Sequence, residues 1–110
     1  MACSLMISVS AQNDSHIRQA QSYQREAEYY TRQALGYERE VDYYNRQAQG
    51  YWKEAKYYSK RKDFDRVKLY QQRAKNATER AENYSRKAKD ARKRAANYMK
   101  KASRALEREK

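Results

Sequence analysis

Tyrosine and alanine recur at seven-residue intervals along most of the chain, with polar residues between them. In the first half, alanine occupies a column three residues before each tyrosine, with Val41 as the exception. These columns correspond to positions a (alanine) and d (tyrosine) of a heptad repeat written abcdefg. The pattern predicts long amphipathic helices that pack along a narrow seam. The predicted seam tyrosines of the whole chain are Tyr23, Tyr30, Tyr37, Tyr44, Tyr51, Tyr58, Tyr70, Tyr84 and Tyr98.

The heptad pattern is interrupted once. Its phase would place seam residues at positions occupied by Lys62 and Asp65, and the apolar columns resume at Val67. We interpret the interruption as a turn, with Asp63 as the cap of the following helix. A continuous helix with a stutter is the alternative, because the turn contains neither Gly nor Pro.

The predicted fold is all-α: a long antiparallel helical hairpin, an Ala/Tyr heptad coiled coil that assembles into a larger bundle or filament. Its segments are an N-terminal apolar segment at 1–14, helices at 15–60 and 66–108, and a turn at 61–65. In a hairpin that folds about this turn, seam residues whose numbers sum to 125 lie opposite each other, and each such pair forms a layer of the seam. Nearly every layer then pairs a large residue with a small one. Three layers break the rule and recur every fourteen residues, about 21 Å along a helix: Ala20 with Ala105, Ala34 with Ala91, and Ala48 with Ala77.

Position c of the first helix carries a second pattern, in which outward tyrosines alternate with Ser or Gly. Gly inside a helix costs about 1 kcal/mol relative to Ala, so its repeated use on one face suggests that something large must fit there. We interpret Tyr29, Tyr43, Tyr57 and Trp52 as assembly knobs that enter notches on another subunit. The notch residues are Ala34, Gly36, Ala48, Gly50, Ala77 and Ala91. The alternatives are tightly packed alanine layers, exposed tyrosines without a partner, and a Trp52 that packs at the seam edge.

The charge is unevenly distributed. Of the net charge of +12, residues 1–60 contribute +1 (8 Lys and Arg against 7 Asp and Glu) and residues 61–110 contribute +11 (18 against 7). Position g of the first helix alternates Gln with Glu, whereas position g of the second helix is uniformly basic. We expect these rows to meet across an antiparallel hairpin and to form interhelix ion pairs. The rows contain Glu26, Glu40 and Glu54 on one side and Arg66, Arg73, Arg80, Lys87, Arg94, Lys101 and Arg108 on the other.

Residues Ala2 to Ala11 are small and apolar, and Val9 and Ala11 suit the −3 and −1 positions of a signal-peptidase site. This segment is interpreted as the remnant of a signal sequence, with a frayed terminus or an assembly arm as alternatives. The expected location is therefore extracellular, and otherwise cytoplasmic. In a secreted protein the sequons at Asn13, Asn76 and Asn83 become candidate glycosylation sites, of which Asn76 and Asn83 share a helical face.

Candidate catalytic chemistry is sparse. His16 is the only histidine and Cys3 the only cysteine, so neither has a partner of the kind that nucleophilic catalysis or metal binding needs. We expect no enzyme activity, no metal and no cofactor. No stretch is long and apolar enough to span a membrane, and the Ala/Tyr seam is too weakly apolar for strong insertion at a membrane surface.

These patterns favour a structural, self-assembling protein whose partner is itself. The alternative is a polyanion-binding protein that uses the Arg and Lys rows of the second half on acidic glycan or nucleic acid. The Tyr- and Lys-rich composition is similar to that of secreted adhesive or thread-forming proteins, but no motif assigns the chain to a family.

Overall fold

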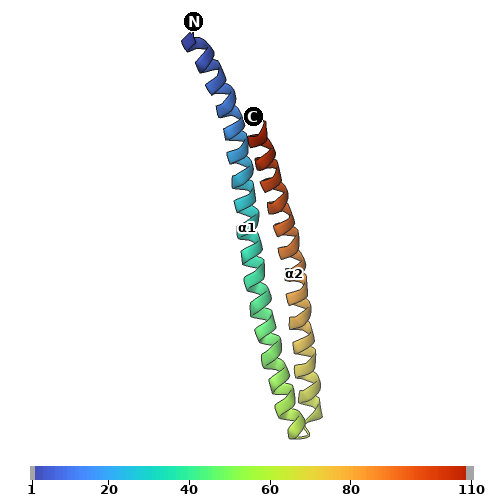
Figure 1. The fold of residues 1–110 in the computed structure, drawn as a ribbon. Coiled ribbons are helices and arrows are strands. Elements are labelled where there is room, and N and C mark those ends of the chain that lie inside the picture. The colour runs from blue at the N-terminus through green and yellow to red at the C-terminus, as the bar shows by residue number, and fades with distance from the viewer. Residues whose placement is uncertain (1, 109–110) are drawn as a thin grey trace. The chain divides into compact units, whose positions relative to one another are not determined.

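The fold is that of a computed structural model, which describes the backbone of residues 2–108 and the side chains of residues 14–108. It consists of two helices, α1 (Ala2–Lys60) and α2 (Phe64–Glu107), and the described residues contain no strand (Figure 1). The predicted all-α helical hairpin is thereby confirmed. Helix α1 begins well before the predicted boundary at residue 15, and α2 begins two residues before residue 66.

The chain leaves α1 through a Schellman motif. The Asp63 N–H donates to the Tyr58 carbonyl and the Lys62 N–H donates to the Ser59 carbonyl, both at 3.1 Å. These two bonds satisfy carbonyls that the end of a helix leaves without partners. Lys62 has a φ of 61°, in the left-handed region that glycine usually occupies. The turn therefore closes without Gly, at the expense of a strained lysine.

Asp63 caps the start of α2, as expected from the sequence. Its Oδ1 accepts a hydrogen bond from the Arg66 backbone N–H at 3.3 Å, and its Oδ2 lies 3.5 Å from Arg66 Nε. The Asp63 carbonyl also accepts the N–H of Val67 at 3.1 Å, which starts the helical ladder. One residue thus ends the first helix and begins the second.

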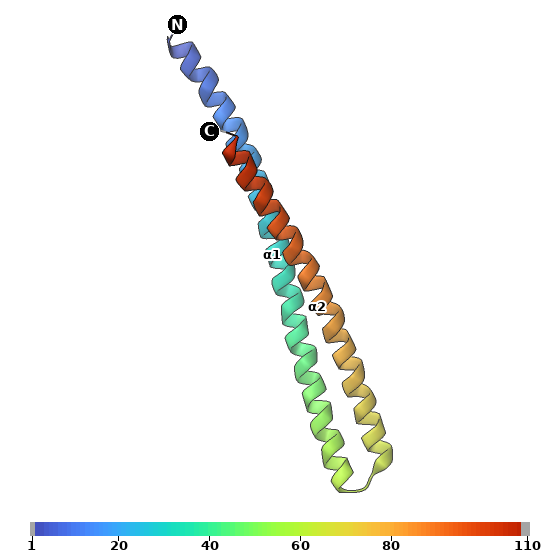
Figure 2. The same cartoon turned by 45° about the vertical axis from the view of Figure 1, so that its right-hand side comes forward.

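The hairpin divides into two compact units. One comprises Met1–Gln33 with Ala91–Lys110, and the other comprises Ala34–Asp90 and includes the turn. Within each unit a stretch of α2 runs back alongside a stretch of α1 (Figure 2). In the first unit, the opening turns of α1 extend past the last turn of α2 (Figure 1).

The core of both units is made of alanine. The buried apolar residues are Ala20, Ala27, Ala34, Ala48, Ala55, Ala74, Ala77, Ala81, Ala88, Ala91, Ala95, Ala102 and Ala105. No large side chain among the described residues is fully buried, and the seam tyrosines are half-buried. Small seam residues let the two helices approach closely, while the tyrosine rings lean out to cover the seam edge.

Cys3, Val9, Ala11 and Asn13 belong to the part of α1 whose side chains lie outside the described residues, so the expectations for the N-terminal segment stay predictions. Within the described residues, no helix is long and apolar enough to cross a membrane.

Candidate functional site

All twelve tyrosines of the chain belong to three clusters of four. Each cluster takes three rings from α1 and one from α2. The clusters are Tyr23, Tyr29, Tyr30 and Tyr98 in the first unit, and Tyr37, Tyr43, Tyr44 and Tyr84 together with Tyr51, Tyr57, Tyr58 and Tyr70 in the second. The fourteen-residue repeat of α1 is therefore expressed as a repeated aromatic cluster.

The geometry within a cluster is the same each time. Tyr84 stacks on Tyr44 with ring centroids 5.8 Å apart and an interplanar angle of 8°, and it tilts against Tyr37 at 6.1 Å. Tyr43 meets Tyr44 edge-on at 5.1 Å. Such offset and edge contacts each contribute about 0.5–1.5 kcal/mol beyond area burial. Because the α2 ring lies between two α1 rings one heptad apart, the contacts agree with the register expected from the sequence.

Most basic residues at position g of the second half of the chain lie on tyrosine rings. We call Arg66, Arg73, Arg80, Lys87, Arg94, Lys101 and Arg108 the cationic row. Six of its members, all except Arg108, lie between 4.9 and 6.0 Å from a tyrosine ring centroid. Arg80, for example, lies 5.6 Å from the centroid of Tyr44. These are cation–π distances.

The ion pairs expected between the two charge rows are not present among the described side chains. Among residues 14–108, no ion pair within 4.0 Å joins Glu26, Glu40 or Glu54 to the cationic row. The cations of the row lie over tyrosine rings instead. A signal was present in the sequence: Arg73, Lys87 and Lys101 each follow an α2 tyrosine by three residues, a spacing that places them on one helical face.

The predicted knobs are exposed. Tyr29, Tyr43, Tyr57 and Trp52 retain 50, 53, 45 and 45% of their surface. Tyr43 is also tied to its own helix, because Gln47 Nε2 donates to its hydroxyl at 2.9 Å, and the Arg61 guanidinium lies 4.3 Å from the ring centroid of Tyr57. Sequence reasoning did not single out the exposed apolar side chains Leu35, Phe64, Leu69 and Met99.

The predicted notch residues divide into two kinds. Ala34, Ala48, Ala77 and Ala91 are buried in the seam. Gly36 and Gly50 face open space, since a Cβ built on either would meet nothing within 4 Å. Packing within the hairpin therefore does not require glycine at these two positions.

Two hollows flank the seam on the side of the cationic row. The hollow in the second unit has a volume of about 170 Å³ and is lined by Tyr44, Gln47, Tyr51, Arg73, Asn76, Ala77 and Arg80. The hollow in the first unit has a volume of about 140 Å³ and is lined by Gln19, Tyr23, Lys101, Arg104, Ala105 and Arg108. Each hollow contains an alanine from one of the Ala–Ala layers, and neither is lined by Gly36 or Gly50.

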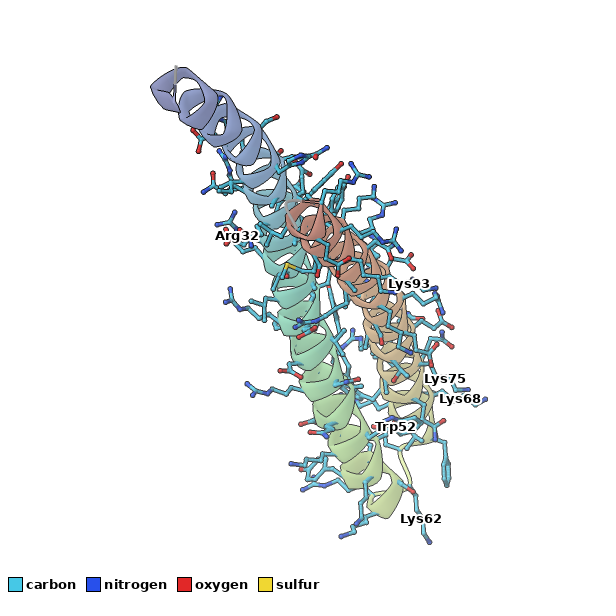
Figure 3. The ribbon with its side chains drawn as sticks, turned by 45° about the horizontal axis from the view of Figure 1, so that its top comes forward. Arg32, Trp52, Lys62, Lys68, Lys75 and Lys93 are labelled. Atoms are coloured by element: carbon cyan, nitrogen blue, oxygen red, sulfur yellow. The ribbon has the colours of Figure 1, made fainter. Side chains whose placement is uncertain are left out.

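Two of the candidate glycosylation sites, Asn76 and Asn83, lie on α2. Asn76 Oδ1 accepts a hydrogen bond from Gln72 Nε2 at 3.1 Å, and Asn83 Oδ1 accepts one from the Arg86 guanidinium. The Thr78 hydroxyl of the Asn76 sequon donates to the Ala74 carbonyl at 2.9 Å. Lys68, Lys75 and Lys93 project from α2 (Figure 3), which adds to the positive charge of that helix.

Over the residues with described side chains, no group of three or more His, Cys, Asp or Glu could hold a metal ion. A scan of protein-family models, a search of curated proteins and a search of solved structures each found no match. Function must therefore be inferred from the chemistry of the chain itself.

Proposed function

We propose that this protein is a self-assembling structural subunit, a helical hairpin that builds an extracellular filament, fibre or matrix. The observation that supports it best is the face formed by position c of α1. There, half-exposed tyrosines alternate with Gly36 and Gly50, which stand in open space. An aromatic knob and a vacant position of the same period are complementary between copies of one chain. When two different surfaces of the same protein bind each other, each added subunit leaves a free surface for the next, so the assembly grows as a filament.

Gly36 and Gly50 have a cost without a benefit inside the hairpin. Each lowers helix stability by about 0.5–1 kcal/mol relative to Ala. Neither has a neighbour that a Cβ would strike. Room for a partner's side chain accounts for both facts.

The thin core supports the same proposal. Every buried apolar residue among those with described side chains is alanine, so the hairpin leaves much aromatic surface in contact with water. Fully burying an aromatic side chain contributes about 1.5–3 kcal/mol, and a ring already half-buried has roughly half of that to gain. Several such rings on each of many identical subunits would stabilise a long assembly.

The test combines negative-stain electron microscopy with sedimentation of the purified chain. Wild-type protein is expected to form filaments with a regular repeat. The double variant Gly36→Leu/Gly50→Leu fills the open positions and is expected to remain monomeric, with its helical circular dichroism retained. The matched control is Gln21→Leu/Gln49→Leu, which adds the same side chains at position b without changing charge and should assemble normally. Unchanged filaments in the glycine variant would refute the notch proposal.

Polyanion binding is a second candidate, favoured by one specific observation. The cationic row lies on neutral tyrosine rings and pairs with none of the carboxylates Glu26, Glu40 and Glu54. A cation on a ring keeps its charge, so the row retains a strong attraction for acidic glycan or nucleic acid. Binding of this kind should weaken steeply with added salt, and binding that is insensitive to salt would exclude it.

A further inference from the structure

The two hollows on the side of the cationic row are repeats of one another. Moving 28 residues forward along α1 turns Gln19 into Gln47 and Tyr23 into Tyr51. On the returning half of the hairpin, each lining residue of the first hollow corresponds to the residue 28 positions earlier, which lines the second hollow. The corresponding residues are Lys101 and Arg73, Arg104 and Asn76, Ala105 and Ala77, and Arg108 and Arg80. Six positions of the repeat thus line both hollows, and Tyr44 is added in the second. We therefore treat the two hollows as one repeated feature of the hairpin.

The linings offer hydrogen-bond donors and positive charge. The second hollow has Arg73 and Arg80, and the first has Lys101, Arg104 and Arg108. Neither lining includes a carboxylate. The position-g residue of α1 at each hollow is Gln, whereas position g in the heptads between Gln19, Gln33 and Gln47 is Glu. The Gln/Glu alternation therefore keeps negative charge out of both hollows.

The polar groups of the second hollow are already oriented by other contacts. The guanidinium of Arg73 lies 5.3 Å from the ring centroid of Tyr70, and that of Arg80 lies 5.6 Å from that of Tyr44. A ring face positions a guanidinium while leaving its in-plane N–H groups for a ligand. The amide oxygen of Asn76 is occupied by Gln72, so its own N–H groups are left as donors.

The walls of the hollow favour one class of ligand. Its volume of about 170 Å³ leaves room for a small ion, and its lining offers donors without a carboxylate. Tyr44 is stacked on Tyr84 and also contacts Arg80, so its ring is poorly available to a nucleic-acid base. A donor-rich hollow that holds arginine forks and excludes stacking suits an oxyanion.

We propose that each hollow is a binding site for one oxyanion group, a sulfate or a phosphate. The proposed site does not depend on self-assembly. It rests on the second candidate function, polyanion binding, and refines it, because it assigns the binding to discrete sites and not to a diffuse positive field. Phosphate and sulfate share the relevant chemistry, and the group could be a free ion or a substituent of an acidic polymer.

The experiment follows the side-chain N–H signals of Arg73, Arg80 and Gln47 by NMR, in the full chain at a concentration below any self-association. Sodium sulfate, inorganic phosphate and a sulfated polysaccharide are titrated separately, each at constant ionic strength maintained with sodium chloride. The expected result is a saturable shift of these three side chains with all three probes, while the exposed Arg39 and Arg46 of α1 do not respond. A response to the polysaccharide but to neither free ion would overturn the proposal.

The variant Gln47→Glu places a carboxylate in the hollow and is expected to weaken sulfate binding there by at least about tenfold, because like charges repel at close range. Gln49→Glu changes the net charge equally outside the hollow and should alter binding less than about twofold. Circular dichroism verifies that both variants fold. Equal effects of the two substitutions, or shifts that do not saturate, would overturn the site and leave only diffuse polyanion binding. Because the binding experiment uses the unassembled chain, its outcome does not depend on whether the protein forms filaments.

Discussion

The two helices of the hairpin contribute different things: α1 provides most of the aromatic rings, and α2 provides most of the positive charge. Helix α1 supplies nine of the twelve tyrosines and a net charge of only +1, whereas α2 supplies three tyrosines and a net charge of +9 (14 Lys and Arg against 5 Asp and Glu). Each cluster needs both contributions, because a ring and its cations from α2 fit among three rings from α1. The chain therefore specifies pairing between unlike helices, and substitutions on either side should reveal the division.

The largest effect should come from removing the aromatic contribution of α2. Tyr84→Ala deletes the ring that contacts both Tyr37 and Tyr44, and we expect a loss of about 2 kcal/mol in the free energy of unfolding, less than for a fully buried aromatic. Tyr43→Ala, on the exposed face of α1, should cost about 0.5 kcal/mol or less. Urea titrations monitored by circular dichroism give both values, and equal losses would show that the α2 ring has no special position.

The start of α2 should depend on its cap. Asp63→Ala removes the acceptor of the Arg66 N–H and is expected to lower the free energy of unfolding by about 1 kcal/mol. Asp65→Ala, two residues further on in the first turn of α2, removes a similar charge without removing the cap and serves as the control. Thermal unfolding compares the two, and a loss at Asp65 as large as that at Asp63 would contradict the capping role.

The end of α1 should improve on substitution. Lys62 has the left-handed conformation that costs a non-glycine residue roughly 1–2 kcal/mol. Lys62→Gly removes this strain but also loosens the unfolded chain, so the expected net gain is about 0.5–1 kcal/mol. Lys56→Gly makes the same exchange inside α1 and should lose about 1 kcal/mol. Urea unfolding of Lys62→Gly measures the change in the free energy of unfolding. A gain would support the strain at Lys62, and a loss would contradict it.

The smallest effect concerns the partner of the cationic row. A double-mutant cycle between Arg80→Gln and Tyr44→Leu is expected to yield a coupling of about 0.5–1 kcal/mol, as for an exposed cation–π contact. The equivalent cycle between Arg80→Gln and Glu40→Gln should yield a coupling near zero. A larger coupling to Glu40 would restore the ion-pair rows expected from the sequence.

The hairpin itself followed from the heptad columns because burial of a repeated apolar stripe has few solutions. The interruption at Lys62 and Asp65 located the turn, and the Tyr/Ala alternation indicated the register with which the ring contacts agree. The partners of the cations were missed because a heptad diagram treats Tyr44 and Tyr84 as points in a seam. Their rings are long enough to reach the edge, where Arg80 and Lys87 lie. The hollows were not expected from the sequence: of the predicted notch residues only Ala77 lines one of them, and their donor-rich linings depend on side-chain positions that periodicity does not give.

The three tyrosine clusters also imply an order of events during folding. Their stacked pairs, Tyr58 with Tyr70, Tyr44 with Tyr84 and Tyr30 with Tyr98, are separated by 12, 40 and 68 residues in the chain. Closing the longest of these loops directly costs about 1.5 kcal/mol more than closing the shortest, although the ring stacking that results is nearly identical. The most favourable route is a zipper that starts at the Lys62 turn, and each cluster that closes shortens the loop still open for the next.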